Sequence, residues 1–108
     1  MIVKLKATVS QYGDLSEGQL YFVIGIEADD YRIINDSGKP YLYPANIFTV
    51  SDSGEPQDWV TNYGEDGERY SYPSQLNDPG FFEDVFDHKP EQTSIFWHNV
   101  NQRLAEAA

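Results

Sequence analysis

Apolar residues concentrate between Leu20 and Asp52, where short apolar runs alternate with turn residues. The run Leu20–Ile26 is nearly continuous and rich in β-branched and aromatic residues, which predicts a strand buried on both faces. Gly25 inside this run indicates a β-bulge or a close approach of another part of the backbone. Turns are expected at Glu27–Asp30 and Asp36–Lys39, because their Asp and Gly residues favour turn conformations.

Shorter patterns predict the other strands of the same sheet. Val3, Leu5 and Ala7 alternate with polar residues, so they should face one side of an N-terminal strand. The predicted strands are Ile2–Val9, Leu20–Ile26, one that begins at Tyr31, Tyr41–Tyr43 and Ile47–Val50. Residues 1–52 should therefore form a five-stranded, strongly bent antiparallel sheet, as in a small barrel or sandwich.

After Ser51 the chain contains more turn residues, and one large apolar residue, Trp59, interrupts them. Trp59 either covers the open end of the sheet as part of the core or, if exposed, marks a partner site. Val60–Tyr63 and Arg69–Tyr72 predict an added hairpin, with acidic residues at its tip and with Tyr70 and Tyr72 on one face. Pro73 should end this hairpin.

Two helices are predicted near the C-terminus. Phe82, Val85 and Phe86 fall on one helical face and indicate a short helix. A longer helix is expected over about Glu91–Glu106, because apolar residues recur at every fourth position and would pack on the sheet. We expect four side chains of the C-terminal half to be substantially buried, namely Trp59, Phe96, Val100 and Leu104.

The segment Gly38–Phe48, GKPYLYPANIF, resembles the end of an SH3 domain. That family has a Gly in its distal hairpin, then a strand, then a turn containing Pro and Asn that leads into the last strand. The resemblance covers Gly38–Phe48 closely and residues 1–52 loosely, and it also fits a group of small bacterial proteins with an SH3-like half. It implies a mainly β (α+β) chain built on an SH3-like antiparallel β-barrel.

On this basis residues 1–108 form a single domain in three parts. An SH3-like sheet over residues 1–52 precedes an acidic loop or hairpin extension over 53–80 and a helical C-terminus over 81–106. The chain departs from the family at three places. Val3–Val9 lacks the Ala-Leu-Tyr-Asp-Tyr signature, and no Trp pair opens the strand that begins at Tyr31. Ile47 stands where the family has a Tyr that stacks on ligands. The resemblance therefore implies the barrel more strongly than it implies binding of proline-rich peptides.

Charge is distributed unevenly along the chain. The 108 residues have a net charge of −11, and residues 52–91 hold eleven acidic and two basic residues. Such a field repels phosphate backbones and anionic membranes and steers a basic protein or peptide, so neither nucleic acid nor membrane is an expected partner. No apolar run approaches the roughly 20 residues that span a bilayer. We expect a soluble, cytoplasmic protein.

The sequence indicates no cofactor and little catalytic chemistry. It has no cysteine, and it lacks both a phosphate-binding Gly-rich loop and a serine elbow. His88 and His98 are ten residues apart, without the spacing that binds zinc on a helix. The acidic residues could gather calcium but do not follow the order of an EF-hand. A pair of them could support glycoside hydrolysis, which makes a small carboxylate-dependent enzyme the weakest alternative.

Two functions fit the sequence better. The first is a non-enzymatic protein–protein interaction module, such as an inhibitor or immunity protein, in which the acidic residues of 52–91 form one surface for a basic partner. Its candidate residues are Tyr63, Glu65, Asp66, Glu68, Tyr70 and Tyr72. The alternative is an SH3-like peptide-binding domain. For that function, the resemblance implies a groove between the loop that contains Asp14 and Glu17 and the turn that contains Pro44.

Overall fold

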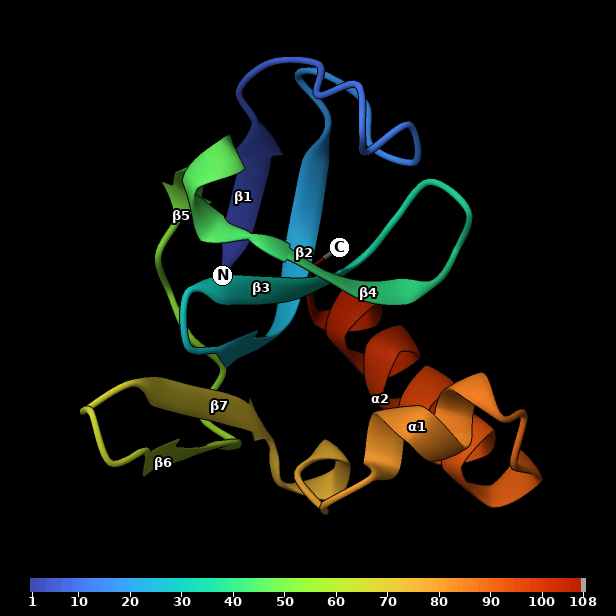
Figure 1. Ribbon diagram of the computed structural model, residues 1–108. Coiled ribbons are helices and arrows are strands. Elements are labelled where there is room, and N and C mark those ends of the chain that lie inside the picture. Colours follow the sequence, from blue (N-terminus) through green and yellow to red (C-terminus); the bar gives the residue numbers. More distant parts are fainter. Residues whose placement is uncertain (108) are drawn as a thin grey trace.

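The computed structural model describes residues 1–107 as an α+β fold with a seven-stranded sheet and a C-terminal helix (Figure 1). The strands are β1 (Ile2–Leu5), β2 (Leu20–Glu27), β3 (Asp30–Ile34), β4 (Pro40–Pro44), β5 (Phe48–Asp52), β6 (Trp59–Tyr63) and β7 (Arg69–Pro73). The helices are the one-turn η1 (Ala45–Ile47) and η2 (Ser74–Leu76), then α1 (Phe81–Phe86) and α2 (Pro90–Ala107).

The first five strands form the antiparallel sheet that the sequence predicts. Their order is β4-β3-β2-β1-β5, and β7 joins the far end of β2 and pairs with β6. The sheet is open, so the predicted barrel is not confirmed.

Two predicted boundaries are wrong. β1 ends at Leu5 rather than Val9, leaving Ala7 exposed, and Ile47 lies in η1 rather than in the last strand.

β2 contributes to two separate apolar cores because a bulge interrupts it. Val23 pairs with Ile33 and Gly25 pairs with Arg32, so β2 has one extra residue, Ile24. The extra residue reverses the alternation of side chains. Tyr21, Val23 and Ile26 therefore all face the first core, whereas Ile24 faces the second. The bulge predicted at Gly25 is confirmed.

The first core lies among strands β1–β5 and the loop that contains Leu15, and the second lies between β2, β7 and the helices. The first consists of Val3, Leu5, Leu15, Tyr21, Val23, Ile26, Ile33, Tyr43 and Phe48. The second consists of Ile24, Tyr72, Leu76, Phe81, Phe82, Val85, Phe96 and Val100. The prediction that the last helix packs on the sheet is confirmed, because α2 buries Phe96 and Val100 against residues of β2 and β7.

The predicted C-terminal elements are present, but three side chains differ from expectation. The hairpin β6–β7 and both helices form where they were predicted. Leu104 is 47% exposed, so the prediction that it is buried is wrong. Phe86 is also exposed, and Phe81 takes its place in the core. Trp59 is only partly buried, at the margin of the first core.

Candidate functional site

The β6–β7 hairpin extends from the sheet, and its turn lies at an edge of the molecule (Figure 1). Four of the five residues of β6 are exposed, and Tyr63 at its end has 71% of its surface exposed. The turn that follows presents Glu65 and Asp66 to solvent. Glu68 instead folds back across the turn, where its Oε2 accepts the backbone N–H of Asp66 at 3.0 Å. The tip thus combines an exposed aromatic ring with acidic groups.

The ladder register places the hairpin tyrosines on two different faces. Tyr63 pairs with Arg69, whereas Asn62 pairs with Tyr70 and Val60 pairs with Tyr72. Directly paired residues share a face, so Tyr70 and Tyr72 lie together, as predicted, and Tyr63 lies on the opposite side. Tyr72 is buried in the second core, which corrects its assignment to a partner surface. Tyr70 is half-buried.

A buried arginine network explains where the Tyr72 side chain lies. The Arg32 guanidinium donates to the Tyr72 hydroxyl at 2.6 Å, to the carbonyl of Pro40 at 2.7 Å and to Glu27 Oε2 at 2.7 Å. Tyr72 donates to the same Glu27 oxygen at 2.6 Å, and Arg32 lies 4.0 Å above the ring of Phe82. Burial raises the pKa of Tyr72, so the hydroxyl stays a donor. The network joins four strands to α1 and is structural.

Ion pairs within the chain neutralise three of its seven basic residues. Arg32 pairs with Glu27, Arg69 with Glu55, and Arg103 with both Asp58 and Glu106. Hydrogen bonds from Arg69 hold the pKa of Glu55 below its usual value. Apart from Asp52 at the end of β5, the remaining acids of residues 52–91 form two groups, one at the hairpin tip and one around α1 on the other side of the molecule (Figure 1). The predicted acidic surface is therefore not one continuous face.

The residues of the predicted peptide groove are only partly brought together. Asp14 accepts hydrogen bonds from Tyr43 at 2.7 Å and from Asn35 at 3.0 Å, which fixes its loop to the β3–β4 turn. Burial is the main cause that raises the pKa of Tyr43. A hollow of about 550 Å³ lies between Gln11–Asp14 and Tyr41–Tyr43.

The other two residues of that predicted groove lie outside the hollow's lining. Glu17 is exposed further along the same loop. Pro44 pairs with Asp30 in the β3–β4 ladder, at the end of β4 next to η1. The geometry therefore supports a contact surface around the Asp14 loop and β4 rather than a groove that ends at Pro44.

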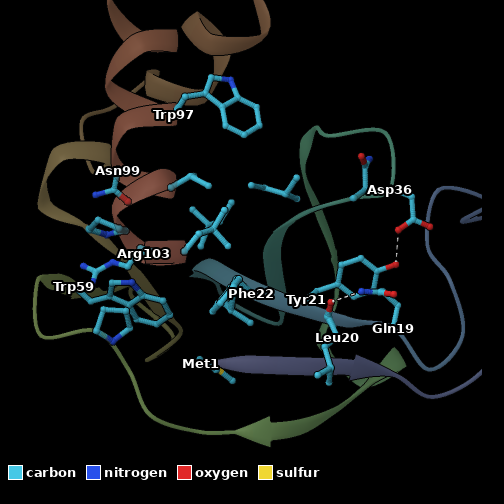
Figure 2. A pocket seen from close by; sticks show the side chains of 18 residues that line it. Met1, Gln19, Leu20, Tyr21, Phe22, Asp36, Trp59, Trp97, Asn99 and Arg103 are labelled. Atoms are coloured by element: carbon cyan, nitrogen blue, oxygen red, sulfur yellow. Dashed lines mark hydrogen bonds between the residues drawn. The ribbon is translucent and has the colours of Figure 1, made fainter. Parts of the chain in front are cut away.

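A second hollow, of about 420 Å³, was not anticipated from the sequence. It lies between the outer face of β2 and the C-terminal half of α2, and both tryptophans line it. In Figure 2, Trp97, Asn99 and Arg103 project from α2, Phe22 and Trp59 lie below them, and Asp36 lies on the far side. We call this hollow the β2–α2 groove. The signal that could have revealed it is the helical spacing of Trp97 and Leu104, which form a stripe beside Phe96 and Val100.

The described residues include no metal-binding cluster and no membrane-spanning helix. Within residues 1–107, no three His, Asp or Glu side chains converge as metal ligands would. His88 and His98 are both exposed. Neither helix combines the length and the hydrophobicity needed to cross a bilayer.

Comparison with known proteins gives no match. The chain matches no protein-family model, no curated protein and no solved structure.

Proposed function

We propose that the chain is a non-enzymatic protein-binding module that recognises a basic partner through the β6–β7 hairpin. The supporting observation is that Tyr63, 71% exposed, stands beside Glu65 and Asp66 at the end of a strand with one free edge. A free strand edge offers unpaired backbone groups to another chain. Tyrosine adds a large contact area at low cost in side-chain entropy.

The acidic tip would act mainly on the rate of association. Arg69, the basic residue nearest the tip, is already paired with Glu55. The tip therefore keeps its negative field, which accelerates encounters with a basic surface and weakens as salt increases. An inhibitor or immunity-type protein for a basic target would use such a field.

Affinity capture from the native host tests this proposal. The test variant is Glu65→Gln, Asp66→Asn and Glu68→Gln in combination. The matched control removes the same charge from exposed acids near α1, through Glu83→Gln, Asp87→Asn and Glu91→Gln. We expect wild type and control to retain a basic protein that the hairpin variant loses. Equal capture by all three proteins would contradict the proposal.

A second candidate is an SH3-like peptide-binding half, which we infer for residues 1–52. Three features support it: the long Asp14 loop, the hairpin turn with Gly38 at φ +76°, and η1 immediately before β5. The hollow beside the Asp14 loop contains Tyr12 and Tyr41, and aromatic side chains of this kind bind proline-rich segments. A fluorescent Pro-x-x-Pro peptide with an added Arg should bind wild type and lose affinity for Tyr12→Ala. Absence of binding at millimolar peptide would exclude this candidate.

A further inference from the structure

The β2–α2 groove exposes apolar side chains that the fold does not need. Phe22, Trp97 and Leu104 line it, and none of them belongs to either core. Trp97 is 38% exposed and Leu104 is 47% exposed. Contiguous apolar surface of this kind on a small protein marks an interaction site.

The groove exists because the apolar surface of α2 is wider than the sheet surface it covers. Phe96 and Val100 face the second core, and Trp97 and Leu104 lie beside them along the same helix. The outer face of β2 continues past this contact, from the buried Ile24 to the partly exposed Phe22. Both walls of the groove, β2 and α2, are fixed by their contacts in the second core. The groove therefore needs no rearrangement to accept an occupant.

Polar groups in the groove already have partners within the chain. Asp36 accepts the Tyr21 hydroxyl at 2.8 Å and the Ser16 hydroxyl at 2.6 Å. Arg103 is held by Asp58 and Glu106, and the buried Asn99 contacts Gln75. An occupant therefore gains stability mainly by covering apolar surface, rather than by satisfying buried polar groups.

We propose that the β2–α2 groove binds an apolar peptide segment of a partner protein, with a Lys or Arg next to the segment at the Arg103 end. At this end the cations are Arg103, Arg69 and the Met1 ammonium, and the four carboxylates of Asp52, Glu55, Asp58 and Glu106 outnumber them, so this end attracts a basic residue. At the opposite end stands one carboxylate, Asp36, which already accepts hydrogen bonds from the Tyr21 and Ser16 hydroxyls. The basic flank is therefore expected at the Arg103 end.

A peptide fits the groove better than two other occupants. A second copy of the chain would bring another net charge of −11 to the same surface, which opposes self-association. A small ligand enclosed in the hollow would leave the rim residues Leu104 and Leu20 in water, whereas a peptide lying across it would cover them. The inference goes beyond the proposed function, because the groove and the hairpin tip are different surfaces.

Selection from a phage-displayed library of random 12-residue peptides tests the groove. We expect binders with at least two large apolar residues and a basic residue at one flank. Phe22→Thr and Leu104→Gln should each weaken them about tenfold, equivalent to ~1.4 kcal/mol. The control is Val50→Thr, because Val50 on β5 is 48% exposed and lies outside the groove lining. It should leave affinity unchanged.

Further measurements distinguish a bound peptide from a second copy of the chain. Because both tryptophans line the groove, both indole N–H resonances should shift when a selected peptide binds. Glu106→Gln should weaken a peptide with a basic flank but not the same peptide with Gln at that position. The proposal is overturned if no peptide is selected, if binders lack a basic flank, or if binding survives Phe22→Thr and Leu104→Gln. A dimer in sedimentation that Leu104→Gln abolishes would instead identify a second copy as the occupant.

Discussion

A single charged side chain, Arg32, links the two layers of the molecule. Its guanidinium is almost fully buried between β2, β4, β7 and α1, and its charge is balanced by Glu27, whose side chain is 32% exposed. Alternation along β3 puts Arg32 on the face opposite Ile33, and a charged residue ordinarily marks such a face as open to solvent. Here the hairpin and α1 fold over that face and form the second core. Only contacts between distant segments reveal this, and no local pattern encodes them.

Glu27→Gln tests the importance of this pair for stability. Removing one partner of a buried pair leaves the other charge uncompensated, which typically costs about 3–5 kcal/mol. We expect a loss of about 2–3 kcal/mol in urea denaturation, because Glu27 keeps some contact with water. Glu55→Gln is the control, since the Glu55–Arg69 pair is more exposed and should contribute under ~1 kcal/mol. Equal losses would contradict the structural role of Arg32.

Buried tyrosines should also limit stability at high pH. Burial raises the pKa values of Tyr21, Tyr43 and Tyr72. Between the unfolded value of about 10 and these higher folded values, the folded state keeps protons that the unfolded state loses. Stability is therefore fully present below about pH 10 and falls as pH rises further. A spectrophotometric titration should show part of the tyrosines ionising only on unfolding, and titration of all eight near pH 10 with the fold intact would contradict this.

At the scale of the elements, Gly25 allows strand β2 to contribute side chains to both cores. A Cβ at Gly25 would lie 2.2 Å from the Tyr72 ring and 2.7 Å from the Ser71 carbonyl oxygen. The sequence indicated a bulge or a close backbone approach here, because a glycine within an apolar strand often marks one of these two features. It could not indicate the neighbour, since β7 lies more than 40 residues further along the chain.

Gly25→Ala should therefore destabilise the protein through overpacking. We expect a loss of about 3 kcal/mol, at the upper end of such effects, because part of the obstacle is backbone. Gly13→Ala is the control, since nothing lies within 4 Å of a Cβ there. Chemical denaturation of both variants measures the difference. A Gly25→Ala protein as stable as the control would show that β7 does not approach β2 as described.

Helix α2 gives a matched comparison between a core side and a groove side. Phe96 is fully buried, so Phe96→Ala should cost about 3–5 kcal/mol. Leu104→Gln should cost less than about 0.5 kcal/mol, because the side chain is half exposed and Gln is a good helix former. Thermal or urea unfolding measures both. A large loss for Leu104→Gln would mean that Leu104 supports the fold and that the groove is part of the core.

For the whole molecule, charge and apolar surface are arranged in ways that the linear sequence only partly predicted. The sequence correctly predicted five antiparallel strands in residues 1–52, the added hairpin and the amphipathic last helix, because each has a local period or turn. It treated residues 52–91 as one acidic surface, whereas the fold separates the hairpin tip from the acids around α1. The groove was missed because its walls, β2 and α2, lie about 75 residues apart in the chain.

β6 connects the two proposed contact surfaces. Trp59 at its start lines the groove, and Tyr63 at its end stands at the acidic tip. Five residues of extended strand separate these positions by roughly 13–17 Å, a span that one protein partner can cover. A single partner could therefore be steered by the tip and retained by the groove.

The rate constants for binding of the partner captured from the host test most directly whether the tip controls association and the groove controls dissociation. They would be measured at low and high salt for wild type, for the hairpin triple variant and for Phe22→Thr with Leu104→Gln. We expect the triple variant to lower the association rate constant at low salt and to lose that difference at high salt. The groove variant should mainly raise the dissociation rate constant, about tenfold or more, at both salt concentrations. Association independent of salt, together with dissociation unchanged by the groove variant, would contradict both proposed surfaces.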